Sequence, residues 1–232
     1  ILISINQVKN QVKKKIRKKQ KEIEHRKKVY TPRPDTKWKQ IEYNMVKAFL
    51  RVLYRIVYRV KKVGEENIED DKPYIICANH INYLDAAAIV LFTKRKVCFV
   101  GKEDLCRSVI LNWLAHLFDC IPIKRNAQDI EAMKRSFKVL KENGILGIFP
   151  EGTRKGLAKG AAIKNGAAFM AVRTGSTVIP VWIKGSFKPF TRVTVNYWKP
   201  LDYSKCQSKS PEKEVLNQVS EEIMSNIIML TK

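Results

Sequence analysis

The 232-residue sequence contains no long hydrophobic run and no segment with the composition of a cleavable signal peptide. A membrane-spanning helix needs about 20 consecutive apolar residues, and none of the apolar runs approaches that length. No internal repeat is evident. At this length, one domain of α/β type with a substantial core is the natural expectation.

Cysteines are few, odd in number and without paired spacing. Cys77, Cys98 and Cys120 lie in apolar, strand-like runs. Buried reduced thiols in a cytosolic compartment are therefore expected instead of disulfides. Cys77 and His80 have a spacing seen in zinc sites, but no second pair completes one, so we expect no metal site. The five cysteines are Cys77, Cys98, Cys106, Cys120 and Cys206.

Acidic residues are scarce relative to basic ones. The sequence has 45 Lys or Arg against 22 Asp or Glu, a formal charge of +23. Residues 1–62 hold 20 basic and 4 acidic side chains, so +16 of this charge lies in the N-terminal region. A polyanionic partner is expected, either a membrane surface or a nucleic acid.

Two amphipathic helices are predicted in this basic region. The first covers residues 1–30 and is broken by the proline-containing segment 31–34. The second runs from about Thr36 to Lys61, with Asp35 as its expected N-cap. We therefore divide the chain into a basic helical region, residues 1–62, for membrane association, and an α/β domain, residues 63–232.

The second helix combines an apolar face with a neighbouring basic stripe. Such a helix lies in a membrane surface, with its apolar face in the acyl region and its cations near lipid phosphates. The alternative is a helix packed on the domain with a solvated basic edge. Its aromatic residues sit among aliphatic ones, which favours lipid over nucleic acid as the partner. The apolar face is Val46, Phe49, Leu50, Leu53, Ile56, Val57 and Val60, and the stripe is Lys47, Arg51, Arg55 and Arg59.

Beyond residue 62, strand-like and helix-like segments alternate. This alternation predicts a parallel or mixed sheet covered by helices. The expected strands are Tyr74–Ala78, Lys96–Gly101, Cys120–Lys124, Ile145–Phe149, Thr177–Ile183 and Thr191–Tyr197. The expected helices are residues 86–92, 108–118, 126–143, 159–173 and one that starts near residue 210.

A histidine and an aspartate follow the first buried strand of this domain. Residues 79–85 read NHINYLD, so His80 precedes Asp85 by five positions. Five positions along one helix would turn the two side chains about 140° apart, at 3.6 residues per turn. His80 must therefore lie in a loop, and Asp85 in the first turn of the next helix, if the two are to meet. In that arrangement Asp85 fixes the imidazole tautomer and leaves the other ring nitrogen as a base. The alternative is a helix cap at Asp85 and an interior, hydrogen-bonded His80.

A second stretch of this kind, residues 149–154 with the sequence FPEGTR, also follows an apolar run. Together, NHxxxxD and FPEGTR resemble the motifs of the glycerolipid acyltransferase family, and the short bacterial-type lysophosphatidic acid acyltransferases are the most similar members. Residues 121–125, IPIKR, resemble the family segment that ends in a phosphate-binding arginine, and residues 178–181, VIPV, resemble its last strand motif. The family usually has glycine six residues before that arginine, where this chain has Asp119.

The resemblance and the residues together give each side chain a role. His80 would take the proton of an attacking hydroxyl, and Asp85 would orient it. No GxSxG motif supplies a nucleophile, so direct attack on the thioester is expected. The resemblance implies that Arg125 and Arg154 bind the acceptor phosphate, with Lys102 as an addition. Glu151 would accept from an acceptor hydroxyl or brace an arginine, Gly152 would allow a positive φ or donate its amide to the oxyanion, and Thr153 would cap the turn.

The expected reaction is transfer of a fatty acyl group from acyl-CoA or acyl carrier protein to the 2-hydroxyl of lysophosphatidic acid, which gives phosphatidic acid. No cofactor or metal is expected beyond this thioester co-substrate. The expected location is the cytoplasmic face of the cell membrane, with peripheral or monotopic attachment. Two alternatives stay open: acylation of glycerol-3-phosphate or another lysophospholipid, and a basic nucleic-acid-binding protein that uses residues 1–62.

Overall fold

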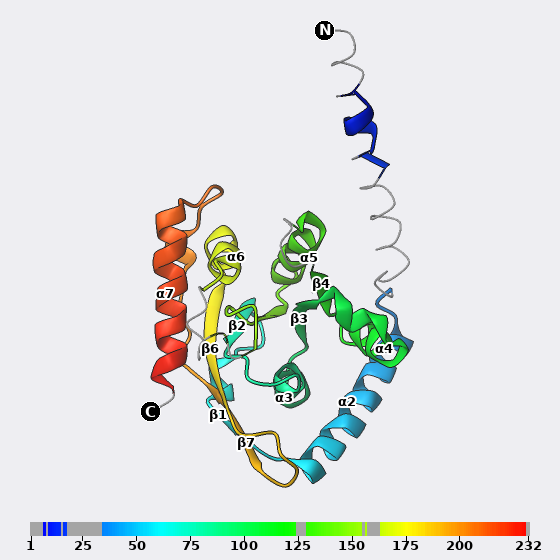
Figure 1. Cartoon of the computed structure of the whole chain (residues 1–232). Coiled ribbons are helices and arrows are strands. Elements are labelled where there is room, and N and C mark those ends of the chain that lie inside the picture. Colours follow the sequence, from blue (N-terminus) through cyan, green and yellow to red (C-terminus); the bar gives the residue numbers. More distant parts are fainter. Residues whose placement is uncertain are drawn as a thin grey trace.

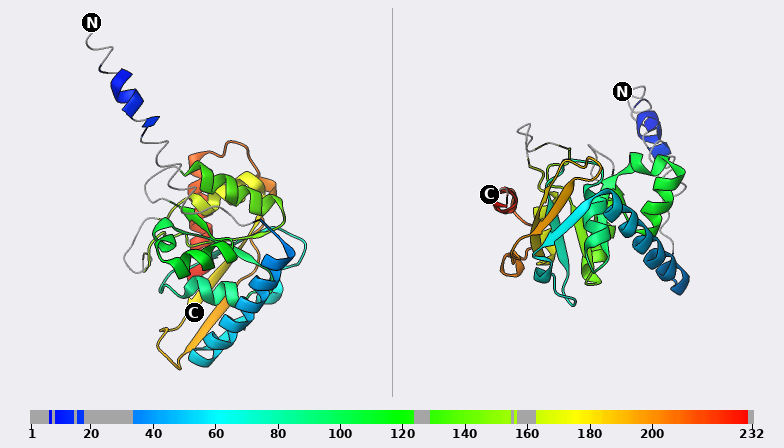
Figure 2. Two further views of the ribbon diagram at one scale, coloured as in Figure 1. Left: turned by 90° about the vertical axis from the view of Figure 1, so that its right-hand side faces the viewer. Right: turned by 90° about the horizontal axis from the view of Figure 1, so that it is seen from below.

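The computed structural model describes residues 7, 9–14, 16–17, 34–123, 129–154, 156 and 163–230. Helices cover both faces of a central sheet (Figures 1 and 2). The strands are β1 (Arg59–Val63), β2 (Tyr74–Ala78), β3 (Val97–Lys102), β4 (Ile121–Ile123), β5 (Ile145–Ile148), β6 (Thr177–Lys184) and β7 (Arg192–Tyr197). The helices are α2 (Lys37–Val57), α3 (Asp85–Phe92), α4 (Val109–Leu117), α5 (Ile130–Lys141), α6 (Gly166–Thr174) and α7 (Lys213–Met229).

The seven strands form one sheet in the order β1-β7-β6-β2-β5-β3-β4. Every neighbouring pair is parallel except β6 and β7, which are antiparallel. The predicted mixed α/β sheet is therefore confirmed. Since β2, β3, β4, β5 and β6 run in one direction, the loops that follow them leave from the same edge of the sheet. In an open α/β sheet this carboxyl edge is where ligands bind.

Alternate side chains of the sheet pack into two hydrophobic cores, one on each face. In β2, Ile76 and Ala78 pack with the core on the side of α2 and α3. Ile75 and Cys77 pack on the opposite side, with the core shared by α5, α6 and α7. All five residues of β2 are buried, as expected for a parallel strand with helices on both faces. The catalytic-motif loop that follows β2 therefore leaves from a rigid support.

The second predicted helix ends earlier than its sequence pattern suggested. Helix α2 stops at Val57, and Arg59–Val63 forms the edge strand β1, paired in parallel with β7. The prediction of helix through Lys61 was therefore wrong, and the division at residue 62 falls within a strand of the sheet. The N-cap is Thr36, whose hydroxyl accepts the N–H of Lys39 at 3.2 Å, instead of Asp35.

The predicted apolar face and basic stripe of helix α2 are each divided between the domain and solvent. Lys47 is buried under the helix, and Arg51 Nε donates to the carbonyl of Leu91 at 2.6 Å. The predicted stripe is thus split, because these two residues face the domain, Arg55 is exposed and Arg59 lies in β1. The predicted apolar face is also split: Val46, Leu50 and Val60 pack against the core, Val57 is half-buried, and Phe49, Leu53 and Ile56 face solvent.

Three further predictions can be compared with the structure. Helix α6 starts at Gly166, and residues 163–165 before it are not helical, so the predicted start at Lys159 was too early. Residues 7, 9–14 and 16–17 are helical, and the rest of the predicted helix over residues 1–30 lies outside the described residues. Within the described residues, no helix is both long and apolar enough to cross a membrane.

Candidate active site

His80 and Asp85 are in direct contact at the carboxyl edge of the sheet. His80 lies in the loop after β2, and Asp85 is the first residue of α3, as the spacing required. Nδ1 of His80 is 2.8 Å from Oδ2 of Asp85, whose side chain is fully buried. The same oxygen accepts the backbone N–H of Ile81 at 2.6 Å and of Asn82 at 2.7 Å. Because the carboxylate accepts, Nδ1 carries the hydrogen, and Nε2 keeps a lone pair for proton transfer.

Stacked aromatic rings support the imidazole of His80. His80 stacks on Phe149 with ring centroids 4.1 Å apart and planes 11° from parallel. Phe99 of β3 packs against Phe149 in turn, at 5.0 Å. This stack requires glycine at position 147, since a Cβ there would lie 2.5 Å from the Phe99 ring. The sequence pattern identified His80 but not the ring on which it rests.

Glu151 joins the two motif loops. Its Oε1 accepts the backbone N–H of His80 at 2.9 Å, and the side chain is only 4% exposed. A buried acceptor of this kind fixes the loop that carries the base, because losing it would leave a buried N–H unsatisfied. Two roles were predicted for Glu151, accepting from an acceptor hydroxyl and bracing an arginine. Neither includes the observed contact, in which the carboxylate braces His80.

Gly152 and Thr153 shape the turn after Glu151. Gly152 has φ of 62°, a conformation that favours glycine, and its N–H donates to the carbonyl of Phe149 at 3.0 Å. That amide is already used within the turn, so it does not point to an oxyanion site. Thr153 is exposed, and its carbonyl accepts the N–H of Gly156 at 3.2 Å.

Arg154 lies over the first motif loop. The central carbon of its guanidinium is 3.3 Å from the centroid of the Tyr83 ring, and both side chains are exposed. A guanidinium stacked on an aromatic face keeps its in-plane N–H donors free to bind a phosphate. Tyr83 is a residue that the motif analysis missed, because its contribution depends on a contact across 71 positions of the chain.

Lys102 and Arg125 are the other two residues predicted to bind the acceptor phosphate. Lys102 ends β3 at the same edge of the sheet, where its ammonium forms an ion pair with Asp104. Its charge is thus partly neutralised by a neighbour on the same segment. Arg125 lies outside the described residues, so its role stays a prediction.

Asp119, the departure from the family pattern, adopts the backbone conformation that glycine would favour. Its φ is 50°, in the left-handed region, where aspartate is tolerated better than most residues. Its carboxylate also binds Lys39 at 2.7 Å and pairs with Lys96. These two ion pairs join the turn before β4 to α2 and to the start of β3, which gives the aspartate a structural role here.

Asn79 fixes the start of the motif to the sheet. Its Nδ2 donates to the carbonyl of Ile183 at 3.0 Å, and its Oδ1 accepts the N–H of the same residue at 2.6 Å. The loop after β2 is thereby tied to β6. Beside it lies a pocket of about 350 Å³ between the two strand ends, lined by Ile81, Asn82, Gly185, Ser186 and Phe187.

Comparisons with known proteins bear on this site. A family model described as acyltransferase matches residues 59–184. The chloroplast 1-acyl-sn-glycerol-3-phosphate acyltransferase of Arabidopsis thaliana is 28% identical over 134 residues, which are 56% of this chain and 37% of that protein. The 1-acyl-sn-glycerol-3-phosphate acyltransferase of Bacillus subtilis is 24% identical over 144 residues, or 62% of this chain and 71% of that protein.

The first relatives are longer than the region they share with this chain. The alignments cover 37%, 39% and 58% of three of them, from Arabidopsis thaliana, Brassica napus and Borreliella burgdorferi. Among solved structures, the 1-acyl-sn-glycerophosphate acyltransferase PlsC of Thermotoga maritima superposes with a TM-score of 0.63 at 24% identity, over 88% of this chain and 86% of that one. This similarity shows a shared fold. Because the family model spans more than half of the sequence and includes both motif loops, this chain belongs to the acyltransferase family.

Proposed function

We propose that this chain transfers an acyl group from a thioester to the 2-hydroxyl of lysophosphatidic acid, which gives phosphatidic acid. The observation that carries the proposal is the contact of His80 with Asp85, which leaves Nε2 as a base. The names of the relatives from Arabidopsis thaliana and Bacillus subtilis support the acceptor. Either acyl-CoA or acyl carrier protein would serve as donor.

The proposed step balances without a covalent enzyme intermediate. The acceptor oxygen attacks the thioester carbonyl while its proton passes to Nε2 of His80. The thiolate leaves as the tetrahedral species collapses, and it recovers that proton from the imidazolium. Asp85 stabilises the imidazolium through Nδ1. No side chain has to act as a nucleophile.

Arg154 would hold the acceptor phosphate. Its guanidinium is placed by Tyr83, which belongs to the same loop as His80. Arg154 comes from the loop after β5, but its guanidinium contacts the segment 79–85 that carries the base, so an acceptor bound at Arg154 would present its hydroxyl near His80. The pocket of about 350 Å³ beside Ile81 and Phe187 would take apolar substrate atoms.

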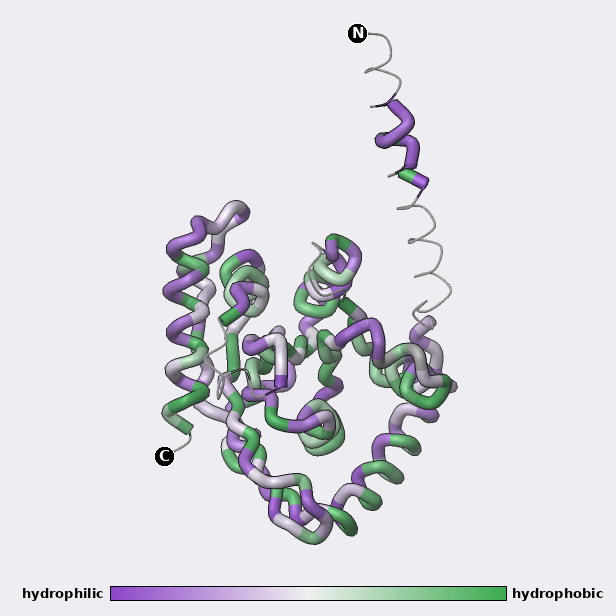
Figure 3. Tube along the Cα trace, in the orientation of Figure 1, coloured by the Kyte–Doolittle hydropathy of each residue, from purple (hydrophilic) through white to green (hydrophobic). Residues whose placement is uncertain are grey.

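Membrane contact would come from exposed apolar residues on α2 and α4. The two helices are joined by a bond of 3.0 Å from Trp113 Nε1 to Glu42, and both carry hydrophobic segments (Figure 3). Neighbouring exposed apolar side chains on adjacent helices are typical of membrane or protein contact sites. The exposed residues are Trp38, Ile41, Met45, Phe49, Val52, Leu53 and Ile56 on α2, and Val109, Ile110, Leu111 and Trp113 on α4. We place this surface on the cytoplasmic face of the membrane, which fits the five free cysteines.

A donor-by-acceptor activity matrix in detergent tests the proposal. Acyl-CoA and acyl carrier protein thioesters are each combined with lysophosphatidic acid, glycerol-3-phosphate and lysophosphatidylcholine, and products are identified by mass spectrometry. Phosphatidic acid should be the main product with at least one donor. If glycerol-3-phosphate were acylated faster than lysophosphatidic acid, the proposed acceptor would be wrong.

A further inference from the structure

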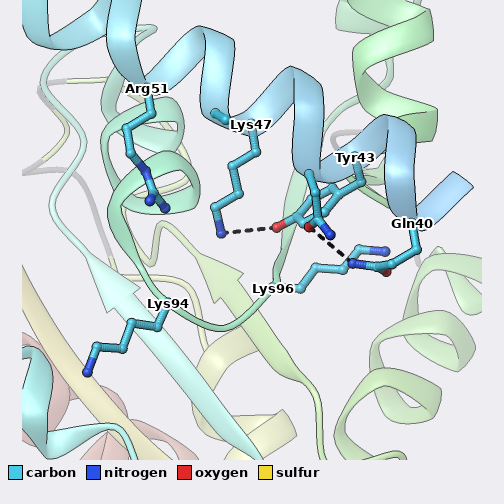
Figure 4. A pocket seen from close by; sticks show the side chains of 8 residues that line it. Gln40, Tyr43, Lys47, Arg51, Lys94 and Lys96 are labelled. Carbon is cyan, nitrogen blue, oxygen red and sulfur yellow. Dashed lines mark hydrogen bonds between the residues drawn. The ribbon is translucent and has the colours of Figure 1, made fainter.

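A second cationic site lies under α2, away from the catalytic loops. A pocket of about 290 Å³ separates α2 from the segment between α3 and β3 (Figure 4). Among the described residues, no carboxylate lines this pocket. Its charged and amide residues are Gln40, Asn44, Lys47, Arg51, Lys94 and Lys96. Since α3 starts at Asp85 and this pocket lies beyond its last residue, Phe92, the pocket and the catalytic contact are at opposite ends of the same helix.

The cations in this pocket have few counter-charges. Lys47 is 7% exposed, and its ammonium donates to the hydroxyl of Tyr43 at 3.2 Å and to the carbonyl of Thr93 at 2.9 Å, both uncharged. Among the described residues, no carboxylate forms an ion pair with Lys47, Arg51 or Lys94, whereas Lys96 is paired with Asp119. A buried ammonium beside a guanidinium is unfavourable without an anion.

The pKa of Lys47 reflects this imbalance. Burial lowers it to about 8, and Arg51 acts in the same direction, while Glu65 opposes them. Glu65 is itself occupied, because it pairs with Lys62 and accepts the backbone N–H of Lys94 at 2.7 Å. Glu65 is therefore shared with other partners and is not a dedicated counter-charge for Lys47 and Arg51.

Capping of α3 explains only part of this arrangement. Lys47 and Arg51 donate to the carbonyls of Thr93 and Leu91, at the end of α3 where cations are favourable. These contacts use only Nε of Arg51, and its two terminal nitrogens have no partner among the described residues. Two of the three ammonium N–H groups of Lys47 are used in these contacts, and the third has no acceptor among the described residues. Figure 4 shows the two side chains extending from α2 toward the loop that carries Lys94 and Lys96.

We propose that this pocket binds a phosphate group as a site separate from the acceptor site at Arg154. A fork-shaped guanidinium next to an ammonium suits a phosphate dianion, and the amides of Gln40 and Asn44 add donors. The pocket is larger than a phosphate ion, so it would also hold a small organic group attached to the phosphate. Neither the family motifs nor the catalytic chemistry uses these residues.

The geometry of α2 bears on the source of the phosphate. Phe49 is two residues from both Lys47 and Arg51, so it lies about 160° around the helix from each, at 100° per residue. The pocket and the exposed apolar face are therefore on opposite sides of α2. A soluble phosphate compound reaches the pocket more directly than a headgroup of the membrane on which Phe49 would rest.

Phosphate binding to the full chain tests the site. Arg154→Ala is introduced first, so that the acceptor site does not contribute, and inorganic phosphate is titrated calorimetrically against chloride at matched ionic strength. In this background, Lys47→Gln with Arg51→Gln should weaken phosphate binding roughly tenfold or more, since two charge-assisted contacts are lost. Lys37→Gln with Arg55→Gln, which also removes two positive charges but from exposed positions of α2, is the matched control and should change phosphate binding little.

Lys94→Gln covers the case in which the double variant does not fold, because this side chain is exposed. It should weaken phosphate binding a few-fold. Phosphate affinity equal to that of the Arg154→Ala protein, in every one of these variants that folds, would overturn the proposal. To identify the source, the same variants are sedimented with phosphatidylcholine vesicles that do or do not contain phosphatidylglycerol. Loss of phosphate binding alone indicates a soluble ligand, and loss of phosphatidylglycerol-dependent sedimentation as well indicates a lipid headgroup.

Discussion

The catalytic loops and helix α2 differ in how their side chains are fixed. In the loop after β2, short-range contacts bring the reactive pair together: Asp85 binds His80 and two backbone amides within five residues. In α2, partners far away in the chain decide it, because Lys47 binds Thr93 and Arg51 binds Leu91. A motif can therefore specify a reactive contact almost alone, whereas a helix needs its neighbours to decide which face is buried.

The largest expected effect concerns the catalytic loop and tests whether His80 is the base. His80→Ala should lower kcat by roughly 10²- to 10⁴-fold, the usual contribution of a positioned general base. Asp85→Asn keeps the shape but favours the wrong tautomer, so it should also impair turnover. Both are measured by single-turnover acyl transfer, with circular dichroism as the control for folding. Turnover near that of the wild type in a folded His80→Ala protein would exclude His80 as the base.

The next effect concerns Arg154 and its aromatic support. Arg154→Ala should raise the apparent KM for the phosphate-bearing acceptor roughly 10- to 100-fold, as expected for a lost charge-assisted contact. The KM for the thioester should change little. Tyr83→Phe keeps the ring and should behave like the wild type, while Tyr83→Ala should raise the acceptor KM less than Arg154→Ala does. A rise confined to the thioester KM would mean that the substrate subsites are assigned in reverse.

The exposed side of α2 provides the corresponding test of the membrane surface. Replacing Phe49 and Ile56 with serine should reduce binding to anionic vesicles about tenfold, because inserted apolar area is lost. Arg55→Gln, a change of one exposed charge on the same helix, should weaken binding less, because one cation near an anionic surface contributes about 1 kcal/mol before salt screening reduces it. Vesicle flotation measures both. Equal binding by the serine variant and the wild type would leave α2 as a packing element only.

The last effect is on stability and concerns the glutamate that braces the catalytic loop. Glu151→Ala leaves the buried N–H of His80 without its acceptor, which should lower the free energy of unfolding by about 1–3 kcal/mol. Glu151→Gln retains an acceptor oxygen at the same place and should lose less. Chemical denaturation of the two variants makes the comparison. If Gln and Ala were equally destabilising, the bond to His80 would not be the reason for burying this side chain.

The same contrast explains what could be predicted from the sequence. The strands before residues 79 and 149, and the meeting of His80 with Asp85, follow from apolar runs and spacing. The end of α2 could not be predicted, because Val60 continues the helical spacing while its strand partner, Val193, comes from β7. Burial of Lys47 was equally hidden, since periodicity does not reveal that α3 ends beneath it. The supports of the site, Phe149 under His80 and Tyr83 under Arg154, depend on contacts between distant loops.

One paired assay tests most directly whether catalysis belongs to the loops and membrane contact to the exposed side of α2. Turnover of a soluble short-chain lysophosphatidic acid and binding to anionic vesicles are measured for His80→Ala and for the Phe49→Ser, Ile56→Ser variant. The histidine variant should bind vesicles like the wild type and lose turnover. The serine variant should lose vesicle binding and keep turnover of the soluble acceptor. If the folded serine variant lost turnover of the soluble acceptor as severely as His80→Ala does, the separation of chemistry from membrane contact would be contradicted.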